Sequence, residues 1–105
     1  IPVTDEAVKL AVSLTRATRP GWPTAPQEVT EYVRYGAGPR GSQGLVLAAK
    51  ARAALRGEAA ADVDDIRALI VPTLRHRLVL SFEAEADGIA PDTVIKGILD
   101  GVGVP

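Results

Sequence analysis

The sequence predicts an all-α fold, a small helical bundle of about five helices with at most a token of short strand. Apolar residues recur at helical spacing in several segments, and proline or glycine separates these segments. The composition is 47% hydrophobic but only 4% aromatic, so the core is expected to consist of Leu, Ile, Val and Ala side chains. The 105 residues suit one compact domain, residues 1–105.

The first predicted helix begins near Thr4, whose side chain suits the N-cap and is followed by two acidic residues. Its apolar stripe is predicted to comprise Val8, Leu10, Ala11, Val12, Leu14 and Thr15. The segment TRPGWPTAP, residues 18–26, ends this helix because its prolines and glycine do not continue one. Trp22 lies in that loop, and we expect it to pin the loop to the core.

Two further helices are predicted before the middle of the chain. QEVTEYVRYG, residues 27–36, has the spacing of a short helix that ends at its glycine. The next helix covers residues 39–56 and stops at Gly57. Its core face is predicted to comprise Leu45, Ala48, Ala49 and Leu55, with the stem of Arg52 at the margin.

The fourth helix begins at Asp62, where Asp65 supplies the acidic partner of a capping box. Asp62, Asp64 and Asp65 resemble a metal-binding cluster, but acidic residues are ordinary in a first helical turn, so we predict no metal site. The buried stripe is expected to be Val63, Ile66, Leu69 and Ile70. Pro72 is predicted to break or kink this helix, which TLRHRLVL then resumes with Leu74 and Leu78 in the core.

The segment LVLSFEAEADG, residues 78–88, is ambiguous. Its apolar residues Val79, Leu80 and Phe82 suit either the end of a helix or a short strand. The final helix is predicted to begin near Pro91, since proline fits the first helical position. Its apolar face is predicted to comprise Val94, Ile95, Ile98, Leu99 and Val102.

Charge and composition exclude several classes of protein. The net charge of −1 argues against a general nucleic-acid binder, and the absence of cysteine excludes disulfides and thiolate metal sites. No apolar run approaches the ~20 residues that a membrane span needs. Residues 1–56 carry +4 and residues 57–105 carry −5. The chain contains no methionine, so we expect it to be a fragment of a larger protein. The lack of cysteine is compatible with a reducing compartment, and the expected location is the cytoplasm.

No complete active site is visible in the sequence. There is no Walker A sequence, and GAGPRG at residues 36–41 is rejected as a dinucleotide motif because no β-rich run precedes it. His76 stands alone between two arginines, so a structural or surface role is expected, and Arg75 or Arg77 is expected to pair with the acidic C-terminal half.

Arg40 is the unusual residue. A cation at a helix N-terminus opposes the helix dipole, and the nearby Gly41 and Gly44 each cost about 1 kcal/mol relative to alanine. An arginine is useful there if a phosphate visits, because helix N-termini bind anions and a guanidinium bonds two phosphate oxygens. Taken alone, the local pattern favours a solvated arginine in a glycine-rich turn.

Five short motifs change that balance. Residues 15–20 read TRATRP, 35–41 read YGAGPRG, 60–66 read AADVDDI, 71–80 read VPTLRHRLVL and 97–105 read GILDGVGVP. In this order and over nearly the whole chain, they resemble the C-terminal helical lid domain of the MoxR family of AAA+ ATPases. The sequence departs from the family at Gly38, where the family often has serine, and at Gly41, where alanine is common. A third departure is the insertion-like PGWPTAPQEV, residues 20–29, between the first helix and the arginine motif.

The resemblance implies that Arg40 is a sensor 2 arginine, both catalytic and cofactor-binding, that contacts the γ-phosphate of ATP in the same or a neighbouring subunit. ATP and Mg²⁺ are then the cofactors of the full-length protein, with none expected on this fragment. The implied partners are its own N-terminal P-loop α/β domain, neighbouring subunits of a hexameric ring and a von Willebrand factor A domain protein. The isolated fragment is not expected to hydrolyse ATP.

The parent's activity would be chaperone-like remodelling or metal-cofactor insertion, driven by ATP hydrolysis. One alternative is a small helical DNA-binding domain that places Arg40, Lys50, Arg52 and Arg56 on phosphates, although the net charge argues against it. A helical protein-interaction module with no nucleotide role is another.

Overall fold

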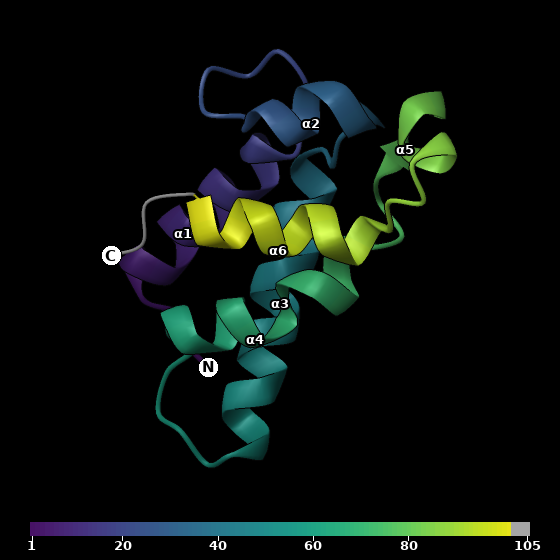
Figure 1. Ribbon diagram of the computed structural model, residues 1–105. Coiled ribbons are helices and arrows are strands. Elements are labelled where there is room, and N and C mark those ends of the chain that lie inside the picture. Colours follow the sequence, from purple (N-terminus) through teal and green to yellow (C-terminus); the bar gives the residue numbers. More distant parts are fainter. Residues whose placement is uncertain (102–105) are drawn as a thin grey trace.

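A computed structural model describes residues 1–101 and confirms the all-α prediction (Figure 1). Within that range there are six helices and one two-stranded sheet. The elements are α1 (Asp5–Ala17), α2 (Gln27–Tyr32), β1 (Val33–Tyr35), α3 (Pro39–Leu55), α4 (Val63–Leu74), β2 (Val79–Leu80), α5 (Phe82–Ala86) and α6 (Pro91–Gly101). The predicted core residue Val102 lies outside the described residues.

Helices α1, α3 and α4 pack on one another and form most of the core, and α6 covers α4. The molecule is elongated, with α2 and α5 toward one end and the loop between α3 and α4 at the other (Figure 1). The core is aliphatic, as predicted, and no aromatic side chain is buried among residues 1–101. Its largest fully buried apolar side chains are Leu14, Leu45, Ile66, Ile70, Leu74, Ile95, Ile98, Val29 and Val94.

The helix starts that the sequence predicts are confirmed. Thr4 caps α1, its hydroxyl accepting a hydrogen bond from the Ala7 N–H at 3.2 Å. Asp62 and Asp65 form the predicted capping box at the start of α4. The two caps are also joined, since the Thr4 hydroxyl donates to the Asp62 carboxylate at 3.1 Å. This bond ties the starts of α1 and α4 together.

Two residues predicted in the core lie at the surface instead. Leu55 is 89% exposed, because the buried side of α3 consists of positions four apart and Leu55 is not one of them. Val8 is exposed because the buried stripe of α1 is rotated by one residue from the predicted one. The residues of these two stripes are Ala7, Leu10, Ala11 and Leu14 in α1, and Gly41, Leu45, Ala49 and Ala53 in α3.

Three predicted boundaries also differ. The second helix stops at Tyr32, and the chain continues as β1, which pairs antiparallel with β2. Pro72 stands inside the last turn of α4, and the chain does not resume a helix after Leu74, although Leu74 and Leu78 are buried as predicted. The ambiguous segment contains both a strand, β2, and the short α5 that begins at Phe82. This extra turn raises the helix count from five to six within residues 1–101.

Candidate functional site

Arg40 is the second residue of α3 and lies at the surface, at the positive end of the helix. Pro39 occupies the first helical position, and Gly38 is the N-cap with no side chain to satisfy the free N–H groups. The side chain of Arg40 makes no hydrogen bond or ion pair with any other residue of the described range, 1–101. Its guanidinium is therefore available to an anion.

The loop before Arg40 is held by the end of α1. The Ala37 N–H donates to the Thr18 hydroxyl at 2.9 Å, and this hydroxyl donates to the Thr15 carbonyl at 2.6 Å. A Cβ added at Gly36 would overlap the carbonyl oxygen of Thr18 and lie 2.8 Å from the Cα of Arg19. The segments TRATRP and YGAGPRG, which are separate motifs in the sequence, are therefore in direct contact.

Gly41 lies where three helices meet. An added Cβ would sit 3.0 Å from the Ala37 Cβ and 3.3 Å from Cδ2 of Leu74, tighter than ordinary contact. The lack of a side chain at Gly41 lets the start of α3 approach α1 and α4 closely. A Cβ added at Gly44 would make only ordinary contacts, the nearest to a guanidinium nitrogen of Arg77 at 3.6 Å. The packing around Gly44 therefore does not require glycine.

A pocket of about 230 Å³ lies beside Gly38 and Pro39. Arg16 and Arg19 of its wall stack on the ring of Trp22, with guanidinium carbons 5.3 and 5.5 Å from the ring centroid. The expectation that Trp22 pins its loop to the core is wrong, because the indole packs on these cations at the surface rather than on the aliphatic core. The sequence signal for this arrangement is the spacing of two arginines three apart before a tryptophan.

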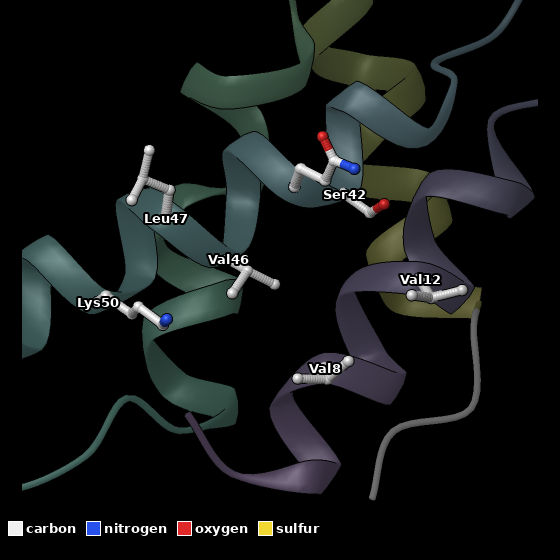
Figure 2. A pocket seen from close by; sticks show the side chains of 7 residues that line it. Val8, Val12, Ser42, Val46, Leu47 and Lys50 are labelled. Atoms are coloured by element: carbon white, nitrogen blue, oxygen red, sulfur yellow. The ribbon is translucent and has the colours of Figure 1, made fainter. Parts of the chain in front are cut away.

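An apolar groove of about 460 Å³ runs between α1 and α3 (Figure 2). Val8 and Val12 line it from α1, and Val46 points from α3 toward them. Leu47, on the rim, is 70% exposed. The groove explains why Val8 is apolar although it lies outside the core, and it begins at Ser42, within one turn of Arg40.

The far end of α3 holds an ion-pair cluster around a buried carboxylate, which the sequence analysis did not predict. Asp65 is 1% exposed and accepts from Arg52 at 2.6 Å and from Arg56 at 2.8 Å. Burial raises the pKa of Asp65, but the Asp62 N–H and the two guanidinium groups outweigh it and hold the pKa below its ordinary value. Two of the four cations that a DNA-binding domain would use are thus committed to Asp65.

The other residues considered as candidates in the sequence are not part of the Arg40 site. His76 is exposed, and Arg75 pairs with Asp92 at 3.0 Å, as predicted for one arginine of that segment. Within residues 1–101, no group of three His, Cys, Asp or Glu side chains is arranged to hold a metal ion. No helix in the same range has the length and apolar character needed to cross a membrane.

Comparison with known proteins identifies the family of the chain. Residues 25–98 match the model of the AAA lid domain family. The chain is 38% identical over 98 residues to Chaperone MoxR1 of Mycobacterium tuberculosis, covering 93% of this chain and 26% of that protein. It is also 38% identical over 66 residues to Protein MoxR of Paracoccus denitrificans, covering 61% of this chain and 20% of that protein.

The fold has a solved counterpart. The whole chain superimposes with a TM-score of 0.92 on 32% of the crystal structure of a proposed ATPase from Cytophaga hutchinsonii, at 30% sequence identity. The chain spans about a fifth to a third of the length of these relatives. The chain belongs to the AAA lid domain family, and it is homologous to the MoxR chaperones.

Proposed function

We propose that this chain is the lid of a MoxR-like AAA+ ATPase and that Arg40 contacts the γ-phosphate of ATP during hydrolysis. The observation that carries the proposal is the guanidinium of Arg40, which has no ion-pair partner among residues 1–101 and lies at the N-terminus of a 17-residue helix. An arginine there opposes the helix dipole and finds no acidic partner among residues 1–101. An anionic ligand satisfies both the side chain and the helix end.

The residues present fit this ligand. When bound, ATP supplies the phosphoryl group that is transferred to water. Arg40 offers two parallel N–H donors to phosphate oxygens and stabilises the charge that develops on the transferred group. The sequence has no P-loop motif, so we propose that an α/β nucleotide-binding domain of the same protein contributes the P-loop together with the Mg²⁺ ligands.

The proposal is tested with Arg40→Ala in the complete ATPase that contains this lid. ATP turnover is expected to fall at least about tenfold, because losing one charge-stabilising donor commonly costs more than that. Arg40→Lys keeps the charge but loses the paired donors, and it is expected to recover only part of the activity. Arg67→Ala removes another exposed helical arginine and is the matched control. Turnover of Arg40→Ala within about twofold of the control would contradict the assignment.

The groove between α1 and α3 supports a contact with the same nucleotide-binding domain. It is apolar, it is open to solvent in this chain, and it begins beside Arg40. Leu47→Asp is expected to lower the thermal stability of the complete ATPase while leaving that of the 105-residue chain nearly unchanged, because Leu47 is already exposed here. Leu55→Asp, at the other end of α3, is the control and should affect both proteins equally little.

The wider activity of the complete ATPase is a further part of the proposal. We propose a cytoplasmic ATPase that works as a hexameric ring and drives chaperone-like remodelling or metal-cofactor insertion, with a von Willebrand factor A domain protein as partner. The relative named Chaperone MoxR1 supports the chaperone-like part. Mass photometry of the complete ATPase with and without ATP tests the ring, and a particle no larger than a dimer in both conditions would contradict it.

A further inference from the structure

We infer that Thr18 is a positioning residue for Arg40, whose hydroxyl fixes the loop from which the Arg40 helix begins. The inference rests on the proposed function of Arg40 and adds a residue that itself touches no ligand. Thr18 lies 22 positions before Arg40 in the sequence and on a different helix end. Its influence therefore passes through the three residues 36–38.

The Thr18 hydroxyl both donates and accepts a hydrogen bond inside the protein. Thr18 is 0% exposed, and its hydroxyl donates to the Thr15 carbonyl at 2.6 Å while it accepts from the Ala37 N–H at 2.9 Å. A buried N–H that loses its acceptor destabilises the protein, so this hydrogen bond holds the Ala37 amide at the Thr18 oxygen. Donation to Thr15 also orients the hydroxyl so that a lone pair faces Ala37.

The loop is also held by its shape. The backbone of Gly36 lies against the Thr18 carbonyl so closely that a Cβ would overlap it. On the other side, the Cβ of Ala37 abuts Gly41 in the first turn of α3. Ala37 is thus bonded to Thr18 through its N–H and packed on α3 through its side chain. A shift of Thr18 is passed through Ala37 to the helix turn that carries Arg40.

Thr18 could instead matter only for the stability of α1, since it is the C-cap residue of that helix. Thr15 separates the two roles. It is buried in the same helix, and its hydroxyl donates only to Ala11, at 2.8 Å, within α1. Replacing Thr15 or Thr18 by valine removes one buried hydroxyl of α1 in each case, but only the change at Thr18 releases the loop before Arg40.

The experiment compares Thr18→Val, Thr18→Ser and Thr15→Val in the complete ATPase. Three quantities are measured for each variant: kcat and KM for ATP, the melting temperature, and backbone hydrogen exchange of residues 36–40 without nucleotide. Hydrogen exchange reports on the loop whether or not ATP is hydrolysed. Serine keeps the hydroxyl and removes only a methyl group, so it tests whether the oxygen is what matters.

Thr18→Val is expected to lower kcat about tenfold with KM changed less than about threefold, because a displaced Arg40 stabilises the transition state less while ATP binding changes little. Exchange of residues 36–40 should become faster in this variant. Thr18→Ser and Thr15→Val are expected to keep kcat within about twofold and normal exchange, even where the melting temperature falls. A Thr18→Val variant that matches Thr15→Val in both kcat and exchange would overturn the inference.

The two proposals fail in different ways. If Arg40→Ala keeps normal turnover, the proposed role of Arg40 is wrong, and the role of Thr18 falls with it. If Arg40→Ala loses turnover but Thr18→Val does not, Arg40 keeps its role and only the positioning by Thr18 is wrong.

Discussion

The two ends of α3 both carry arginine, yet they surround it differently. Arg52 and Arg56 lie near the C-terminal end, where the dipole favours cations, and both bond to the buried Asp65. Arg40 lies at the N-terminal end, where the dipole disfavours it, and it has no partner among residues 1–101. The same helix thus has two arginines in ion pairs and one arginine whose position the helix dipole disfavours. The charge partner and the helix end distinguish the two.

The largest loss of stability is expected from removing Asp65, which binds the arginines at the C-terminal end of α3. Asp65→Ala deletes an ion-pair acceptor and one half of the capping box, so the free energy of unfolding should fall by about 3 kcal/mol in urea titrations. Asp64→Ala, an exposed acid in the same helical turn, should change it by less than about 0.5 kcal/mol. Equal losses for the two variants would mean that the buried cluster contributes no special stability.

At the other end, the loop before Arg40 is predicted to be sterically intolerant. Gly36→Ala should lower the free energy of unfolding by about 1–3 kcal/mol, because the new methyl group meets the Thr18 carbonyl. Gly38→Ser is the control in the same loop, where nothing lies within 4 Å of an added Cβ. Serine at this N-cap should stabilise the chain by a few tenths of a kcal/mol, about the difference between glycine and serine caps. A gain in stability for Gly36→Ala would refute the close contact.

Replacing one arginine at each end of α3 tests the difference between the two ends directly. Arg52→Ala should destabilise the chain by about 1 kcal/mol, since Asp65 keeps only one guanidinium partner. Arg40→Ala should stabilise it by about 0.3–1 kcal/mol, because a cation leaves the positive end of the helix. Thermal unfolding followed by circular dichroism measures both variants. If Arg40→Ala also destabilises the chain, the argument that the helix dipole makes Arg40 unfavourable is wrong.

The smallest effect concerns pH. The pKa of Asp65 is lower in the folded chain than its ordinary value of 3.8, so its contribution to stability is complete above that value. The contribution is lost as the pH falls through the folded-state pKa. The difference in unfolding free energy between wild type and Asp65→Asn should therefore be constant from pH 7 to 5 and shrink near pH 3. A difference that grows on acidification would contradict the lowered pKa.

Local rules explain which parts of the fold could be predicted. The caps at Thr4 and Asp62 and the start at Pro91 depend on a few neighbouring residues, and all three predictions are confirmed. The exposure of Leu55 and Val8 depends on which side of each helix the neighbouring helices cover, and the periodicity of one helix does not define that side sharply. The antiparallel pairing of β1 with β2 joins segments more than 40 residues apart, so a short helix was predicted where β1 lies.

The candidate site divides in the same way. The position of Arg40 at a helix start follows from Pro39 and the glycines around it, and it was predicted. The support from Thr18 was not, because 19 residues separate its hydroxyl from the Ala37 amide. The partners of Asp65 are likewise residues on another helix, and the sequence shows only its capping role. Roles set by one helical turn are readable from the sequence, whereas roles set by contacts between helices are not.

Trp22 gives this end of the molecule an optical signal. It is the only tryptophan in the chain, and its ring centroid lies 5.3 and 5.5 Å from the guanidinium carbons of Arg16 and Arg19, beside Gly38 and Pro39. Indole fluorescence responds to nearby charge, so a change in either arginine alters the emission of that one residue. In this chain, tryptophan emission therefore reports from the neighbourhood of the Arg40 helix start without any attached dye.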